Sequence, residues 1–536
     1  MPPKSRDFKP KAKSKASNPQ SEIEYLEAAE QHEQAGGKWR AGDAAKGARF
    51  FQRAIQMYDE GLVKFPQSFD LAYNKAHLEY QTCEDERVAP HLGSKVALLQ
   101  ETLASHRAAL LLNRENLDIQ FNTGQVLSSL AEALLEDEAE TEARVAARPL
   151  LEEAADLFAK CLAAQQREYE QMALQWNTMQ TEQSNLHPND AGMQTEADGE
   201  KTTDAASETS SATGEWATVE EALTPEVILE TCTAQLGVLT TLLGLYNPTE
   251  LSSLEKRVQE GLYTVNTSIS TLISLVDNAP PPPTVDERAG PTLSISSPST
   301  KKEHALTPKD DALLAAAIFQ VAVAEASYRN GNITAPQYAS TISTLFTTLI
   351  QGSQSPEQQV AQQSAYADAL IDVAEAASTS SDAETQWNAL SEAQKLLTQL
   401  VKPQYNAHLS PDRLADIFDT RADIDLTRFS LSFADTAKAA WRSSRNVLVS
   451  NAGVFYRGAK SYAERVGDGE QAKATGAKAV VAEVLKQVLE KGDGAITAKH
   501  EWKAQQAEVK QALEQMVNEN ILGQREGEEV LRIVSQ

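Results

Sequence analysis

The stretch of sequence that decides the fold is GDAAKGARFFQRAIQMYDEGLVKFPQSFDLAYNKA, residues 42–76. Small residues, one aromatic residue and a closing proline follow one another along it at the spacing of a packed helix pair: Gly42, Ala54, Tyr58, Gly61 and Pro66. A second unit opens with Leu71-Ala72-Tyr73-Asn74-Lys75-Ala76, and a third opens with Phe121-Asn122-Thr123-Gly124. These units predict stacked helix pairs, an architecture that makes a concave binding surface far more often than an active site.

The units resemble the tetratricopeptide repeat (TPR), a helix pair of about 34 residues. The step from Gly42 to Ala76 is 34 residues and the step from Ala76 to Gly124 is 48, so the second unit carries longer helices or an insertion. The resemblance covers the N-terminal half and fades beyond residue 279, where only amphipathic helices match. The alternative is an irregular helical bundle that has this spacing by chance. The second helix of the third unit is expected to include Ala154, Phe158 and Cys161.

The resemblance implies a client-binding groove. In the family, the first helix of each pair lines the concave face, and an asparagine there grips the backbone of a bound peptide because its amide both donates and accepts. The residues that match are Tyr73 and Asn74 in the second unit and Phe121 and Asn122 in the third. We therefore expect these four side chains to form the binding site for a protein client.

Composition and periodicity divide the chain into helical and core-poor segments. We expect a disordered basic tail at 1–21, TPR-like repeats at 22–180, an acidic Ser/Thr-rich disordered loop at 181–222, further repeats at 223–278, a proline-rich linker at 279–309 and a helical, repeat-like region at 310–536. Alternating strand patterns are nearly absent. The predicted fold class is all-α, a TPR-like α-solenoid of antiparallel helix pairs that is interrupted by a loop and followed by a second helical half.

Several helix boundaries carry their own signals. A serine or threonine before a proline caps the first turn, and the proline fits its backbone angle, which predicts helices beginning at Pro225, Pro356 and Pro411. Arg329-Asn330-Gly331-Asn332 predicts a turn between two antiparallel helices. The segment Gly467-Asp468-Gly469-Glu470 lacks the spacing of a phosphate-binding loop and follows no strand, so it also predicts a turn.

The formal net charge is −27, and it is unevenly distributed. Residues 1–21 contain six basic residues and one acidic residue, so the remainder carries about −32. A body this acidic repels phosphate backbones, which argues against nucleic-acid binding by the core and favours a basic protein as the partner. The lysine-rich tail suits nuclear import and no secretory signal follows it, so the expected location is the cytoplasm, the nucleus or both.

The chain carries no recognisable catalytic constellation, neither an HExxH pair nor a GxSxG elbow. Three distant cysteines, Cys83, Cys161 and Cys232, predict reduced core thiols rather than disulfides or a zinc site. We therefore expect no enzyme activity, no metal and no cofactor. The longest uncharged stretches, 231–249 and 330–356, are rich in Thr, Ser, Gln and Asn, and we expect no membrane partner.

Charge and repeats together favour a dedicated carrier or assembly chaperone for a basic client, such as a ribosomal protein or a histone. The alternative is a TPR-like scaffold subunit that joins components of a larger complex through both helical halves. Salt dependence separates the two functions, because a charge-driven complex weakens steeply as ionic strength rises.

Overall fold

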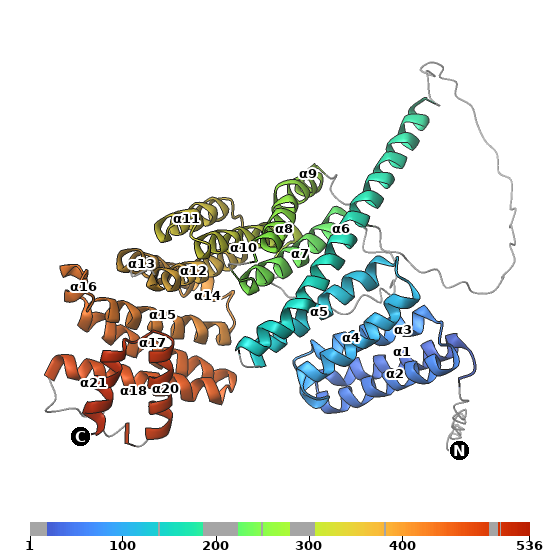
Figure 1. Cartoon of the computed structure of the whole chain (residues 1–536). Coiled ribbons are helices and arrows are strands. Elements are labelled where there is room, and N and C mark those ends of the chain that lie inside the picture. The colour runs from blue at the N-terminus through green and yellow to red at the C-terminus, as the bar shows by residue number, and fades with distance from the viewer. Residues whose placement is uncertain are drawn as a thin grey trace, which may run out of the picture. The chain divides into compact units, whose positions relative to one another are not determined.

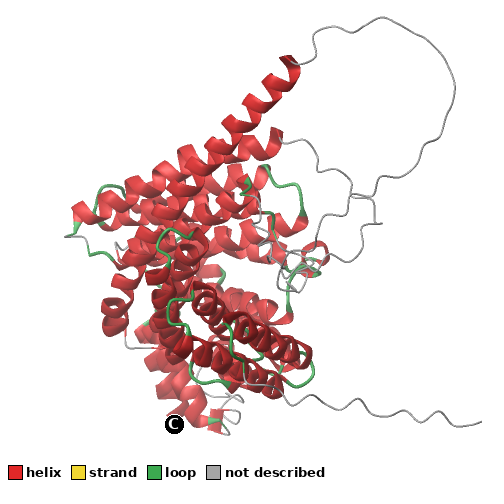
Figure 2. Cartoon of the chain, turned by 90° about the vertical axis from the view of Figure 1, so that its right-hand side faces the viewer, coloured by secondary structure: helices red, strands yellow, loops and turns green. Residues whose placement is uncertain are grey.

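The computed structural model describes residues 19–137, 140–185, 223–247, 250–278, 306–379, 382–491, 502–503 and 505–535. Within these ranges every regular element is a helix, so the predicted all-α fold class is confirmed (Figure 2). The tail at 1–21, the loop at 181–222 and the linker at 279–309 lie largely outside the described residues. Where they are described, residues 181–185 continue a helix and residues 308–309 begin another.

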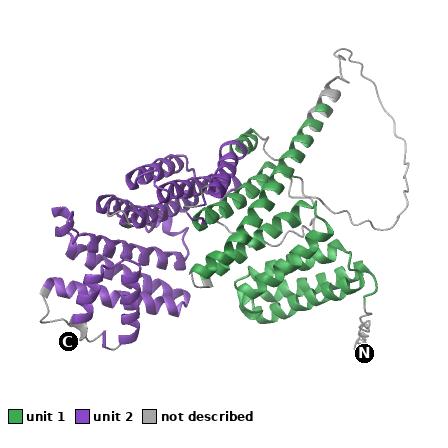
Figure 3. Ribbon diagram, viewed as in Figure 1, with its two compact units in different colours: residues 1–245, 270–278 green, residues 246–269, 279–536 purple. Residues whose placement is uncertain are grey.

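The chain divides into two units, which Figure 3 shows in green and purple. Unit 1 comprises residues 1–245 and 270–278, and unit 2 comprises residues 246–269 and 279–536. The helices of unit 1 are α1 (Glu22–Arg40), α2 (Ala44–Lys64), α3 (Phe69–Cys83), the 3₁₀-helix η1 (Ala89–His91), α4 (Lys95–Leu112), α5 (Leu117–Asp137), α6 (Glu140–Asn185), α7 (Pro225–Leu245) and α9 (Ser270–Asn278) (Figure 1). From α1 to α7 each α-helix packs against the next, which is repeat-like packing.

Alternate helices of unit 1 also touch, and they form a row of first helices. α1 contacts α3, α3 contacts α5, and α5 contacts α7. Because successive first helices lie side by side, the stripes they turn away from their partners make one continuous face. The four predicted client-binding residues belong to α3 and α5 of this row.

The second helix of the first pair buries the residues that mark it in the sequence. Ala54, Tyr58 and Gly61 of α2 are buried, and a Cβ atom at Gly61 would lie 3.0 Å from the Leu71 side chain and 3.1 Å from that of Tyr25. Side chains from α1, α2 and α3 therefore share one core. The second helix of the third unit is also confirmed, because its three predicted residues are buried in α6: Ala154, Phe158 and Cys161.

Gly42, in contrast, does not occupy a helix. α1 ends at Arg40 and α2 begins at Ala44, so Gly42 lies in the loop that connects them. The neighbouring Asp43 carboxylate accepts the backbone N–H of Lys46 at 2.9 Å and caps α2. The interval counted from Gly42 is therefore wrong as a distance between equivalent helix positions.

The close helix contact of the first pair is made by Gly36 of α1. A Cβ atom at Gly36 would lie 2.6 Å from the Phe51 ring of α2, and one at Gly124 of α5 would lie 2.8 Å from the Phe158 ring of α6. Both glycines admit an aromatic ring from the second helix of their own pair. A methyl group at either place forces the ring to move, so these contacts set how closely each pair packs.

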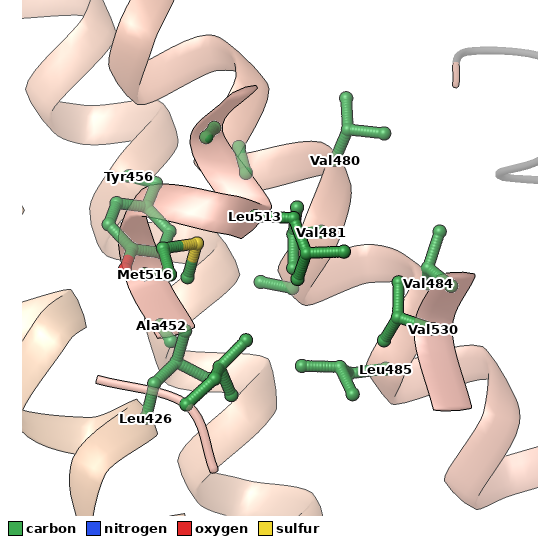
Figure 4. Packing of buried hydrophobic residues seen from close by; sticks show 14 of the residues in the cluster. Leu426, Ala452, Tyr456, Val480, Val481, Val484, Leu485, Leu513, Met516 and Val530 are labelled. Atoms are coloured by element: carbon green, nitrogen blue, oxygen red, sulfur yellow. The ribbon is translucent and has the colours of Figure 1, made fainter. Parts of the chain in front are cut away.

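The helices of unit 2 begin with α8 (Leu251–Tyr263) and the π-helix η2 (Thr264–Ile269). They continue with α10 (Pro308–Arg329), α11 (Ala335–Gln351), α12 (Pro356–Thr379), α13 (Ala383–Leu400), α14 (Pro403–Asn406), α15 (Pro411–Leu431), α16 (Ala439–Ser443), α17 (Arg445–Val466), α18 (Gly469–Lys491), α20 (Gln506–Asn518) and α21 (Gln524–Ser535). The longer helices again pack against their sequence neighbours. Figure 4 shows the core that α15, α17, α18, α20 and α21 share, with Val481, Leu513 and Val530 buried in it.

The predicted helix starts and turns are confirmed. α7, α12 and α15 begin at the predicted prolines, and the hydroxyls of Thr224, Ser355 and Ser410 accept a first-turn N–H at 3.5, 3.2 and 3.4 Å. Gly331 has φ +74° in the turn between α10 and α11, and Gly467 has φ +83° in the turn between α17 and α18. Only a residue without a Cβ adopts this left-handed conformation freely, so glycine occupies both positions at little cost in conformational free energy.

Unit 2 also buries an ion cluster. The Lys478 ammonium of α18 lies 3.0 Å from an oxygen of Asp419 and 3.1 Å from one of Asp423, both on α15, and the buried Tyr456 hydroxyl of α17 donates to Asp423. Burial raises the pKa of Asp423, while Lys478 opposes that shift. The hydroxyl and the ammonium pair with the two carboxylates, so the cluster ties α15, α17 and α18 together.

Two helices, α7 and α10, are long and apolar enough to cross a membrane by length and composition alone. Core helices pass the same test, and more than half of the apolar window of α7 is buried inside unit 1. Its apolarity is accounted for by packing, because Leu236, Leu239 and Leu243 are completely buried.

Gly124→Ala tests the close packing of α5 on α6. The new methyl group meets the Phe158 ring at 2.8 Å, so we expect a loss of roughly 1–3 kcal/mol in the free energy of unfolding. Gly237→Ala is the matched control, because no atom lies within 4 Å of its Cβ position in α7, and alanine there stabilises a helix by about 0.5–1 kcal/mol. Urea unfolding followed by circular dichroism measures both. Equal stability of the two variants contradicts the packing.

Candidate functional site

The four predicted client-binding residues lie on the neighbouring helices α3 and α5, and the structure brings two of them together. The Asn122 side-chain amide of α5 donates to the Tyr73 hydroxyl of α3 at 3.4 Å. This contact crosses from the second helix pair to the third. Tyr73 and Asn122 are half-buried, so both still reach the surface.

The other two residues point elsewhere. The Phe121 ring packs edge-on against Phe158 of α6, with ring centroids 5.5 Å apart, and so supports the third helix pair. The Asn74 amide donates to the backbone oxygen of Asp70 at 2.8 Å, one turn earlier in its own helix. Asn74 and Asn122 therefore occupy similar places in the sequence but make different contacts.

A row of rings extends the site along α3. Tyr73 lies between Phe69, at a ring-centroid distance of 5.6 Å, and His77, at 5.9 Å and nearly parallel. The three residues are four apart, which places them on one side of a helix. All three are half-buried. The Nε2 atom of His77 lies 2.7 Å from the side-chain nitrogen of Gln81.

An exposed carboxylate borders this row. Burial raises the pKa of Tyr73 and the Asp118 charge raises it further, while the hydrogen bond from Asn122 opposes the shift. Burial lowers the pKa of His77, and Asp118 opposes that shift. Both rings are therefore neutral at pH 7, and Asp118, exposed in the first turn of α5, supplies the negative charge. Neutral ring faces beside a carboxylate attract ammonium and guanidinium groups.

The predicted site omitted Phe69 and His77, and Asp118 was not assigned to it. The spacing of Phe69, Tyr73 and His77 was the available signal, since residues four apart share one side of a helix. No comparable signal linked Asp118 to Tyr73, because they meet only when α5 packs beside α3.

Unit 1 also buries titratable side chains away from this face. His106 of α4 is 0% exposed, and its Nδ1 lies 2.9 Å from the Thr102 backbone oxygen. Burial lowers the pKa of His106 to about 4.

The three cysteines are free and buried, as predicted, and burial raises the pKa of both Cys161 and Cys232 to about 12, so neither thiol ionises at neutral pH. In the part of the chain that the structure describes, no three metal-ligating side chains come together.

No protein-family model matches the chain. The UPF0656 protein C926.02 of Schizosaccharomyces pombe is 33% identical over 159 residues, which are 30% of this chain and 33% of that protein. The match thus spans a third of the relative, whose name states no activity or partner. A solved circular tandem repeat protein with novel repeat topology and enhanced subunit contact surfaces aligns over 93% of this chain and 100% of its own, with a TM-score of 0.29 and 11% identity. That likeness carries no conclusion.

His106 predicts acid sensitivity of unit 1. As the pH falls below 6.5 the unfolded chain takes up a proton at this ring, whereas the folded chain does so only near pH 4. Protonation therefore stabilises the unfolded state. The free energy of unfolding should fall by roughly 3 kcal/mol between pH 7 and pH 4. His106→Phe should remove this contribution to the pH dependence of the free energy of unfolding. His91→Phe, at an exposed position, should keep it, and identical slopes in both variants rule out His106 as the cause.

Proposed function

We propose that this chain is a non-enzymatic helical-repeat protein that binds a basic segment of a protein client on the face formed by α3 and α5. The observation that carries the proposal is the exposed Asp118 beside the neutral ring row of Phe69, Tyr73 and His77. We call this set of side chains, together with Asn122, the α3–α5 face. Its residues offer binding groups for a cation.

The contacts suggest how a client is held. A lysine or arginine side chain lies over the ring of Tyr73 or His77 and directs its charge toward Asp118. Asn122, held by Tyr73 at 3.4 Å, offers its amide oxygen to a backbone N–H of the client. The acidic remainder of the chain draws basic segments toward this face and raises the rate of encounter.

Assignment of the helix pairs to the TPR family is part of the proposal. Support comes from the row of first helices and from the buried Ala54, Tyr58 and Gly61 of α2. The unit lengths depart from the family, since Gly36, Ala76 and Gly124 are separated by 40 and 48 residues. We therefore propose repeats of the TPR type whose units are longer than those of the family.

The proposed role is a carrier or assembly chaperone for a basic protein, such as a ribosomal protein or a histone, in the cytoplasm, the nucleus or both. Such clients are exposed to nonspecific association until they reach their complexes, and an acidic carrier covers their charge. The same acidity disfavours nucleic-acid binding by the body of the chain. A membrane partner is not part of the role.

A scaffold subunit is the second candidate. It is favoured by the presence of a second unit with its own core, formed by residues such as Val481, Leu513 and Val530. A scaffold holds its partners through packed, partly apolar interfaces, so its complexes resist salt better than those of a charge-driven carrier.

Asp118→Asn tests the α3–α5 face. The variant loses one carboxylate, so its affinity for a fluorescein-labelled Lys/Arg-rich peptide should fall about five- to tenfold, or roughly 1 kcal/mol. Asp70→Asn is a matched control, because Asp70 stands in the first turn of α3 just as Asp118 stands in the first turn of α5. Fluorescence anisotropy at low salt measures both affinities.

Equal affinities of the two variants contradict the α3–α5 face as the site. Repeating the titration of the unaltered chain at high salt separates the two roles. A steep loss of affinity supports a charge-driven carrier, while binding that is indifferent to salt favours the scaffold.

A further inference from the structure

Unit 2 contains a surface pocket that the proposed function does not use. It has a volume of about 340 Å³ and opens between the C-terminal end of α15, the segment after it, α13 and the start of α21. Thr427 and Ser430 of α15, Phe433, Asn520 and Arg525 are among its lining residues. All belong to unit 2.

The pocket walls are fixed by hydrogen bonds across the chain. The Ser430 hydroxyl accepts the backbone N–H of Gly523 at 3.1 Å and lies 3.4 Å from the Ile521 oxygen, so α15 holds the loop before α21 in place. In that loop Asn520 has φ +57°, a conformation uncommon for a residue with a Cβ. Asparagine adopts this left-handed conformation more readily than most residues with a Cβ, and here it follows directly after the end of α20.

Arginines gather around this pocket in an otherwise acidic chain. Arg525 lines it directly, and the Arg445 guanidinium lies 3.6 Å from the ring centre of Phe433, which is 39% exposed. Arg445 is held there by its Nε and Nη2 groups, which donate to the hydroxyl and backbone oxygen of the buried Ser432 at 2.8 and 2.6 Å. The guanidinium is thus oriented before any ligand arrives.

One carboxylate, that of Glu526, lies near these arginines. Burial lowers the pKa of Arg445 and the nearby Arg442 lowers it further, while Glu526 opposes the shift. Arg442, Arg445 and Arg525 form no ion pair with a residue that the structure describes, whereas Lys438, in the same region of the chain, pairs with Glu384 at 2.6 Å. Three arginines beside one carboxylate leave a net positive charge around the pocket, which favours an anion.

We propose that this arginine pocket binds an acidic peptide segment of a protein partner. Guanidinium groups hold carboxylates in two-point contacts, and the exposed Phe433 ring offers an apolar surface to a neighbouring side chain of the same segment. Free phosphate has no apolar group to cover the exposed Phe433 ring, so a peptide makes more contacts with the pocket than a compact polyanion does. This inference does not rest on the α3–α5 face and concerns a second partner of opposite charge.

The test uses the full chain and a fluorescein-labelled peptide of alternating Glu and Phe. The double variant with Arg442→Gln and Arg525→Gln changes two exposed side chains, and its affinity should fall about tenfold or more in fluorescence anisotropy. Arg532→Gln is the matched control, because Arg532 is an exposed arginine of α21 that pairs with Glu529 outside the pocket. It should bind the peptide as the unaltered chain does. Circular dichroism establishes that both variants fold.

Three results overturn the proposal. The first is equal peptide affinity of the double variant and the Arg532→Gln control. The second is equal affinity of the unaltered chain for a peptide in which every Glu is replaced by Gln. The third is displacement of the peptide by inorganic phosphate at a concentration at which sodium chloride of equal ionic strength has no effect, since that identifies a free-anion site.

Discussion

Each helix of this chain must cover the apolar stripe of its neighbour in the sequence, and the rest of the structure depends on that constraint. Most of a helix's stability in a protein comes from packing of its apolar stripe rather than from its own propensity, so order here comes from burial against the next helix. In unit 1 the contact tightens where Gly36 and Gly124 admit the rings of Phe51 and Phe158. Because neighbours in the sequence remain neighbours in space, α1, α3, α5 and α7 form a row.

Much of this organisation was predictable from the sequence because its signals are local. A threonine or serine before proline marks a helix start wherever it occurs, and Ser410 caps α15 as expected. The loop position of Gly42 was not predictable by the same means, since glycine serves both close helix contacts and turns. Gly36 and Gly42 look alike in the sequence, and only the cap provided by Asp43 distinguishes them.

The α3–α5 face was predictable in part. Tyr73 and Asn122 meet across α3 and α5, whereas Asn74 bonds within α3 and Phe121 packs against α6. The rotation of each helix about its axis decides such contacts, and tertiary packing sets that rotation. The role of Asp118 depends on packing in the same way, because its charge acts on rings of a different helix.

The two surfaces differ in charge and in construction. The α3–α5 face combines neutral rings with one exposed carboxylate, and the arginine pocket combines oriented guanidinium groups with an exposed ring. A chain that carries both can hold a basic segment in unit 1 and an acidic segment in unit 2. This arrangement suits a protein that binds two partners of opposite charge.

Hydrogen–deuterium exchange with peptide-level mass spectrometry shows whether a basic client lies on the α3–α5 face. Exchange is compared with and without a saturating Lys/Arg-rich peptide. Our account predicts slower exchange in residues 69–81 and 117–126, with little change in the second helices α2 and α4. Protection confined to α15–α21, or unchanged exchange in α3 and α5 of a chain saturated with peptide, would contradict it.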